Sequence, residues 1–179
     1  MKSKLLGTVT IAALATIGVG GLQPAMAQES LKIGFVSTFS GSQAAIGEDM
    51  RRSVDLAVEH LGGKIAGKKI EIVYEDDQFK PDVGKARSEK LVQQDKVAFV
   101  AGYIWSNVLL ASYKTVTEEG DTILISSNAG PSQIAGEGCN KNFFSTSWQN
   151  DQTPMAMGEY LNTKGVKSLY LVEIGRAHV

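Results

Sequence analysis

Short apolar segments recur along the chain and alternate with longer stretches that mix apolar and charged residues. Each apolar segment is four to six residues long and rich in β-branched side chains. Both features are typical of buried β-strands. The pattern therefore predicts five strands. They cover residues 31–36, 70–74, 97–101, 122–125 and 168–172.

The stretches between the strands have the periodicity of helices. Apolar residues recur every three or four positions from Ile46 to Leu61, with charged residues between them. Gly62 follows, where a glycine can cap a helix in the left-handed conformation. Three more helices are predicted, and the first and last of them carry a proline in the first turn. They cover residues 81–94, 107–119 and 153–164.

Strands that alternate with crossover helices form a parallel sheet that is covered by helices on both faces. The predicted fold class is therefore α/β, with a doubly wound parallel sheet. The segment 126–152 is rich in Ser, Asn and Gly and shows no periodic pattern. A long segment of this kind within a compact domain is usually functional. We interpret it as both a functional loop and a crossing between structural units.

The N-terminal end has the pattern of an export signal. Lys2 and Lys4 precede an apolar stretch over residues 5–22, and Ala25-Met26-Ala27 has the small-x-small form that a signal peptidase accepts. A transmembrane anchor is the alternative, but the apolar stretch is short and diluted by glycines. We expect residues 1–27 to be a signal peptide, cleaved after Ala27, and the mature chain to reside in the periplasm.

The C-terminal end is unusual in a different way. Residues 173–179 resemble the translation of a common sequencing-adapter oligonucleotide, so we expect a non-native tail there. A natural terminus is the alternative. It would leave the strand predicted at residues 168–172 without a following helix to cover it.

Composition and charge narrow the function classes. The chain is 43% hydrophobic and 21% charged, which is typical of a globular protein with a substantial core. The signal segment contains two lysines and no acid, so its removal changes the formal net charge from -1 to -3. The basic residues are scattered rather than gathered on one stripe, so we expect no nucleic-acid partner.

No catalytic or cofactor motif is present. The sequence lacks a nucleophile elbow, a phosphate-binding loop, a dinucleotide fingerprint and a zinc-protease motif. Only His60, His178 and Cys139 offer nitrogen or sulfur side-chain ligands, so we expect no metal and no cofactor. Cys139 is the single cysteine, and it is either free or paired with a group outside this sequence. Asp76-Asp77 could form an acid–base or metal pair, but adjacent acids after a strand are more typical of a turn.

Ligands of open parallel sheets bind beyond the carboxyl ends of the strands. The loops at 37–42, 102–107 and 126–130 follow the first, third and fourth predicted strands, and all are small, polar and glycine-bearing. Ser106 and Asn107 could hold an anionic group at a helix start or could simply cap that helix. Tyr103 and Trp105 could offer flat apolar surface to a ligand or could belong to the core.

These segments resemble the type I periplasmic-binding proteins of the branched-chain amino acid importer class. That class contains the leucine/isoleucine/valine-binding family and its aromatic-acid-binding relatives. The resemblance covers residues 31–172 and rests on the order and spacing of four motifs. They are Ile33-Gly34 with Phe39-Ser40-Gly41, then residues 70–77, 97–102 and 123–130.

The resemblance implies two α/β lobes that are joined by three crossing segments and close on a ligand. It places the first lobe at residues 28–147, and the hinge crossing with the start of the second lobe at 148–172, with Trp148 and Gln149 at the hinge. It implies a monomer without catalytic activity that delivers a small carboxylate to an inner-membrane permease of an ABC transporter. A sensor of the same fold and an exported α/β hydrolase are the alternatives.

The resemblance also assigns ligand-binding residues. Ser106 corresponds to a ligand-binding hydroxyl, and Asn128-Ala129-Gly130 to the segment that binds the carboxylate. Gly130 stands where amino-acid binders usually have Thr or Ser, which favours an aromatic acid over a branched-chain amino acid. The full expected set is Ser40, Tyr103, Trp105, Ser106, Asn107, Asn128, Ala129 and Gly130.

Overall fold

The structure is a computed structural model that describes residues 30–171. The expected signal peptide with its cleavage point after Ala27 and the expected tail at 173–179 lie outside the described residues. Among the helices of residues 30–171, none has the length and apolar character needed to cross a membrane.

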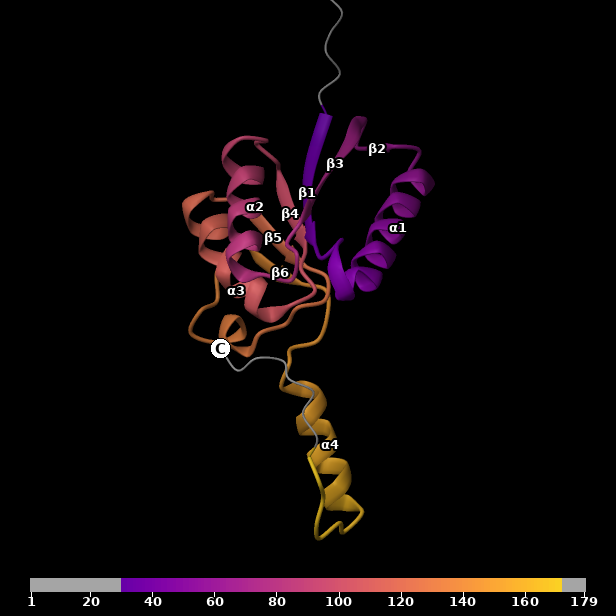
Figure 1. The fold of residues 1–179 in the computed structure, drawn as a ribbon, viewed down its shortest axis with the longest axis vertical. Coiled ribbons are helices and arrows are strands. Elements are labelled where there is room, and N and C mark those ends of the chain that lie inside the picture. Colours follow the sequence, from indigo (N-terminus) through magenta and orange to yellow (C-terminus); the bar gives the residue numbers. More distant parts are fainter. Residues whose placement is uncertain (1–29, 172–179) are drawn as a thin grey trace, which may run out of the picture.

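Six strands form one sheet in the order β2-β3-β1-β4-β5-β6 (Figure 1). All neighbouring pairs are parallel except β2 with β3, which is antiparallel. The α/β fold class with a largely parallel sheet is therefore confirmed. The strands are β1 (Ser30–Ser37), β2 (Lys64–Ile65), β3 (Lys68–Asp76), β4 (Phe99–Gly102), β5 (Ile123–Ser126) and β6 (Phe143–Ser145).

The first four predicted strands correspond to β1, β3, β4 and β5. β2 and β6 were not predicted, because strands of two and three residues are too short to show a hydrophobic pattern. The strand predicted at 168–172 is wrong over its described part, since residues 168–171 form no strand and Tyr170 is 99% exposed. A strand needs a neighbour for its backbone hydrogen bonds, and no strand of residues 30–171 pairs with this segment.

All four predicted helices form. The third is extended by a π-helical stretch, η2 (Thr115–Glu119), and short 3-10 turns occur at η1 (Gly41–Gln43) and η3 (Ser132–Ala135). The helices are α1 (Ala44–His60), α2 (Pro81–Gln93), α3 (Ser106–Lys114) and α4 (Gln152–Thr163).

The main core lies between the sheet and the pair of helices α2 and α3. Val36, Val100 and Leu124 of β1, β4 and β5 are fully buried on this face, against Leu91 of α2 and Leu109 of α3. The two helices pack closely at Gly84, where a β-carbon would lie 2.3 Å from Cγ1 of Val108. This packing fixes α3, whose first residues belong to the candidate site.

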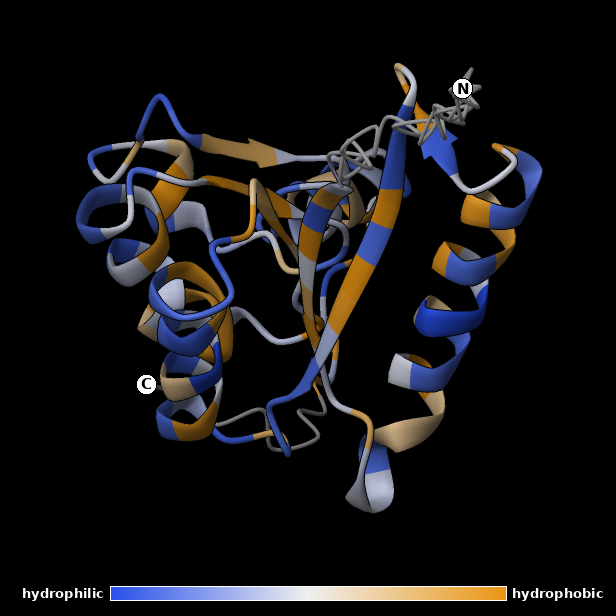
Figure 2. Cartoon of the chain, turned by 90° about the horizontal axis from the view of Figure 1, so that it is seen from above, coloured by the Kyte–Doolittle hydropathy of each residue, from blue (hydrophilic) through white to orange (hydrophobic). Residues whose placement is uncertain are grey.

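The opposite face of the sheet is covered less completely. α1 stands on this side, across the sheet from α2 and α3 (Figure 2). Because side chains alternate along a strand, Phe99 and Ala101 of β4 and Ile123 and Ile125 of β5 point away from the main core, and all four are only half-buried. Apolar surface therefore remains on this face in the described part of the chain.

Helix α4 projects away from the sheet and its covering helices (Figure 1). None of its residues is buried, and Met155, Met157 and Tyr160 are all exposed. A group of large apolar side chains that are all exposed on one short helix is unusual for a surface that faces solvent.

Candidate ligand-binding site

The candidate site is one edge of the sheet, which we call the rim. Strands β1, β3, β4 and β5 are parallel, so their carboxyl ends meet at this edge (Figure 1). We define the rim by the loops that follow these strands, together with the segment that leads to α4. These loops are residues 38–40, 77–80, 103–107 and 127–131, and the segment is 146–151.

A buried hydrogen-bond chain ties three of the loops together. Thr38 Oγ1 donates to Asp77 Oδ1 over 2.5 Å, and Trp105 Nε1 donates to Thr38 Oγ1 over 2.9 Å. The backbone N–H of Phe79 also donates to Asp77 Oδ1, over 2.8 Å. Since Thr38 and Asp77 are fully buried, this chain links the ends of β1, β3 and β4 beneath the surface of the rim.

The two neighbouring acids of the rim have opposite electrostatic environments. Burial raises the pKa of Asp77, and the charge of Asp76 adds to that rise, against the hydrogen bonds from Thr38 and Phe79. Asp77 Oδ2 has no hydrogen-bond partner among the described residues. Burial therefore makes the Asp77 carboxyl harder to ionise than a solvent-exposed aspartate.

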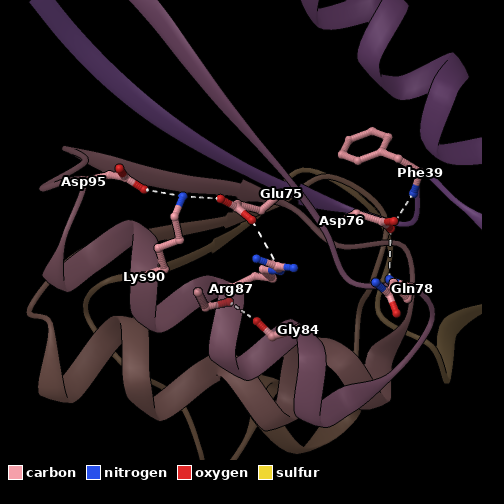
Figure 3. Close-up of polar contacts among 9 residues, drawn as sticks. Phe39, Glu75, Asp76, Gln78, Gly84, Arg87, Lys90 and Asp95 are labelled. Atoms are coloured by element: carbon pink, nitrogen blue, oxygen red, sulfur yellow. Dashed lines mark hydrogen bonds and ion pairs between the residues drawn. The ribbon is translucent and has the colours of Figure 1, made fainter.

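Asp76 is instead held as a carboxylate. Its Oδ1 accepts hydrogen bonds from the backbone N–H groups of Phe39 and Gln78, each over 2.9 Å (Figure 3). Burial raises its pKa, but these bonds and those from Ser40 outweigh burial, so the pKa is lowered overall. The two acids thus organise the turns around them. Within residues 30–171, no group of three or more His, Cys, Asp or Glu side chains is placed to hold a metal ion.

The start of α3 presents polar groups to the segment that leads to α4. Trp105 is the N-cap residue and makes no side-chain capping bond, so neither Ser106 nor Asn107 occupies the cap position. Ser106 Oγ accepts a hydrogen bond from Asn150 Nδ2 over 2.9 Å. Asn107 Oδ1 accepts from the backbone N–H of Val108 over 3.0 Å. The Ser106 hydroxyl thus faces the crossing segment.

The loop after β5 is tied to the loop after β4. Asn128 Nδ2 donates to the carbonyl of Ile104 over 2.9 Å, and the N–H of Ala129 donates to the carbonyl of Tyr103 over 3.0 Å. Gly130 then meets the crossing segment, because its carbonyl accepts from the N–H of Asn150 over 2.8 Å. Asn128, Ala129 and Gly130 therefore lie beside the start of α3.

Tyr103 is placed in the core, which corrects its expected role as a ligand-contacting ring. Its side chain is fully buried, its hydroxyl lies 2.6 Å from Ser88 Oγ, and burial raises its pKa to about 12. The backbone turns sharply here, since Gly102 has φ +110 and Tyr103 has φ +62. This turn directs the tyrosine ring inward. Trp105, two residues later, is 7% exposed and lies at the rim.

Phe79 is a rim residue that the sequence analysis missed. Its ring packs on Trp105 with centroids 4.4 Å apart and planes inclined by 51°, and it remains 41% exposed. The only sequence signal is an aromatic residue in the otherwise polar turn between Asp77 and Pro81.

The predicted site residues do not share one pocket. The residues that line a pocket of about 290 Å³ include Gly130, Gln149, Ile134 and Phe143. A second, of about 340 Å³, contains Asn128 and side chains of α1. Ser40 is exposed and forms a hydrogen bond with Asp76, apart from the other predicted residues.

The predicted hinge residue Trp148 is 62% exposed and lies where the chain leaves the sheet.

Known proteins share this arrangement. A family model described as "Periplasmic binding protein" matches residues 30–176. The chain belongs to this family. A Leu/Ile/Val-binding protein homolog of Brucella melitensis is 28% identical to this periplasmic binding protein over 163 residues, which are 90% of the chain and 42% of the homolog.

Two solved structures bear the same likeness. A solute-binding protein of an ABC transporter from Rhodopseudomonas palustris, in complex with benzoate, has a TM-score of 0.72 and 33% identity over 77% of the chain and 38% of its own. The branched-chain amino acid transporter substrate-binding protein of Streptococcus pneumoniae, in complex with isoleucine, has a TM-score of 0.68 and 28% identity over 76% of the chain and 39% of its own. This periplasmic binding protein chain thus spans about two fifths of the length of these relatives.

Proposed function

We propose that the complete protein is the solute-binding component of an ABC importer, which captures a small carboxylate and delivers it to an inner-membrane permease without catalysis. One observation carries this proposal. In a chain of the periplasmic binding protein family, the polar groups of Ser106, Asn128 and Gly130 gather at one edge of a parallel sheet, next to the start of a helix. Helix starts and backbone N–H groups favour anionic ligands.

The ligand class follows from chemistry that two relatives share. The Rhodopseudomonas relative was solved with benzoate and the Streptococcus relative with isoleucine, and both molecules carry a carboxylate. Gly130 supplies no hydroxyl, so an amino acid would find one donor fewer here. We therefore favour an aromatic carboxylate, with a branched-chain amino acid as the other member of the proposed class.

We also propose that residues 28–147 form a first lobe and 148–172 a hinge crossing with the start of a second lobe. Helix α4 supports this division, because it lies outside the sheet and buries none of its residues. Trp148 and Gln149 come where the chain leaves the sheet, which suits a hinge. Closure of two lobes would cover the rim and exclude water from the ligand.

The proposed site of action is the periplasm, with the protein acting as a monomer after cleavage behind Ala27. The N-terminal pattern of lysines, an apolar stretch and Ala25-Met26-Ala27 supports export. N-terminal sequencing of the protein secreted into the periplasm of a bacterial host tests the cleavage point. A first residue other than Gln28 would contradict it.

Thermal unfolding of the complete protein with a panel of ligands tests the function. We expect benzoate- or cinnamate-type acids, or Leu, Ile and Val, to raise the melting temperature, because a ligand at 100 times its Kd stabilises the folded state by about 2.7 kcal/mol. Benzamide and leucinamide, which lack the carboxylate, are the matched controls and should have no effect. If no carboxylate raises the melting temperature, or if an amide does so equally, the proposal fails.

A further inference from the structure

The exposed ring of Phe79 lies where a ligand at the rim would meet it. Phe79 is in the turn that follows β3, and its ring reaches Trp105, which follows β4. Because β1 lies between β3 and β4 in the sheet, this aromatic pair spans the end of the central strand. Ser106, whose hydroxyl faces the rim, is the next residue after Trp105. An apolar platform therefore lies directly beside the polar groups.

The turn that carries Phe79 is held in a conformation that non-glycine residues rarely adopt. Gln78 has φ +52 and Phe79 has φ +60. Each of the two backbone N–H groups donates to a carboxyl oxygen, Gln78 to Asp76 Oδ1 and Phe79 to Asp77 Oδ1. Strained backbone of this kind persists only where surrounding groups fix it. The position of the Phe79 ring is thus set by the two acids.

Trp105 packs against that ring. Its side chain is almost completely buried, and its indole N–H is committed to Thr38 Oγ1. Thr38 in turn donates to Asp77, so one buried carboxyl fixes both rings of the pair, Phe79 through its backbone and Trp105 through Thr38. Removal of this carboxyl would release both rings together.

We propose that Phe79 is a specificity-determining residue whose exposed ring binds the flat body of an aromatic carboxylate, and that Asp77 is the positioning residue that holds Phe79 and Trp105 in place. A planar ligand stacks on an aromatic ring with more contact than a puckered or branched one. The same placement brings the carboxylate of the ligand toward Ser106 and the start of α3. This inference rests on the proposed function, because it assumes that the rim binds a carboxylate.

Calorimetric titration of the complete protein with benzoate and with cyclohexanecarboxylate tests the role of Phe79. The two acids differ mainly in the planarity of the ring. We expect the wild type to prefer benzoate, and Phe79→Leu to raise the Kd of benzoate about fivefold or more while the Kd of cyclohexanecarboxylate changes less than twofold. Phe144→Leu is the matched control, since Phe144 is also exposed but lies on the β6 edge of the sheet, and it should keep the wild-type preference.

The role of Asp77 needs a readout that does not depend on the ligand. The 179 residues contain two tryptophans, so Trp148→Phe leaves Trp105 as their single tryptophan. Every tryptophan of the complete protein outside these residues is also replaced by Phe. In this background we expect blue-shifted emission from the buried indole, a red shift in Asp77→Ala, and recovery of the wild-type spectrum in Asp77→Asn, which keeps an acceptor for Thr38. The benzoate affinity should follow the same order.

The possible results separate the two proposals. If Phe79→Leu keeps the preference for benzoate, or if Asp77→Ala leaves the Trp105 spectrum unchanged, the aromatic platform is overturned while the transport function stands. If the wild type binds leucine but neither benzoate nor cyclohexanecarboxylate, the aromatic platform is likewise overturned and the transport function stands. If the wild type binds no carboxylate at all, both proposals are overturned.

Discussion

A β-carbon on Gly130 would stand 2.2 Å from the carbonyl oxygen of Trp148. The absence of a side chain at Gly130 lets the crossing segment lie directly on the loop after β5, where the N–H of Asn150 donates to the Gly130 carbonyl over 2.8 Å. The glycine at position 130 therefore has a second effect besides the lack of a side-chain hydroxyl. It sets how closely the crossing segment approaches the rim.

The first prediction concerns this contact. Gly130→Ala should lower the free energy of unfolding by about 1–3 kcal/mol, because the new β-carbon must push the Trp148 backbone away. Gly158→Ala is the matched control, since nothing lies within 4 Å of a β-carbon there and alanine favours the α4 helix. Urea denaturation of the complete protein measures both. Equal stability of Gly130→Ala and the wild type would show that the contact is absent.

A second prediction follows from the lowered pKa of Asp76. A carboxyl with a lowered folded pKa adds stability above its unfolded value of 3.8, and this stability is lost as the pH falls through the folded value. Asp76→Asn should therefore destabilise the protein by about 1–2 kcal/mol at neutral pH and by much less in acid. Urea denaturation at several pH values measures the difference.

Asp77 provides the opposite case on the same turn. Its pKa is raised, so its contribution to stability is present in acid and is lost as the pH rises through the raised value. Because asparagine does not titrate and so lacks this pH-dependent contribution, Asp77→Asn should cost most in acid and least at neutral pH. If Asp76→Asn and Asp77→Asn show the same pH trend, the assignment of a lowered pKa to Asp76 and a raised pKa to Asp77 is wrong.

A third prediction concerns the ion pairs that hold α2 to β3 (Figure 3). Glu75 is buried, and its carboxylate lies 2.5 Å from Lys90 Nζ and 3.5 Å from Arg87 Nε. A double-mutant cycle with Glu75→Gln and Lys90→Met should give a coupling of about 0.5–3 kcal/mol in urea denaturation. The pair Asp49–Arg52, at 2.6 Å but exposed on α1, is the control and should couple by less than about 0.5 kcal/mol. Equal coupling in the two pairs would contradict the role of burial.

A fourth prediction tests the placement of Tyr103. Tyr103→Phe removes the hydroxyl that lies beside Ser88 and should cost about 1 kcal/mol of stability in urea denaturation. The cost is small because Ser88 Oγ keeps its bond to the carbonyl of Gly84. The ligand affinity of the complete protein should change less than twofold. A larger loss of affinity would show that the Tyr103 ring contacts the ligand after all.

Much of the fold could be predicted from the sequence because its elements repeat a simple pattern. Strands β1, β3, β4 and β5 are apolar segments between periodic helices, and each was predicted to within a few residues. β6 could not be predicted, because the three residues Phe143–Ser145 pair with β5 only through tertiary contacts. The segment 168–171 has the composition of a strand, but composition alone supplies no neighbour to pair with.

The candidate site was predicted less completely. The rule that ligands bind at strand ends located Ser106 and Asn128 at the rim. It failed for Tyr103, because two residues with positive φ turn the chain and direct that ring into the core. It missed Phe79, because Asp76 and Asp77 indicate a turn but do not show which way the side chains of that turn point.

The central claim is that this rim holds the ligand, and calorimetric titration of the complete protein measures that most directly. We expect one carboxylate bound per chain and recovered chemically unchanged, with an affinity at least about tenfold lower in the double variant Ser106→Ala/Asn128→Ala. Ser30→Ala, at the opposite end of β1, should bind like the wild type. Wild-type affinity in the rim variant, or conversion of the ligand to a product, would contradict the account.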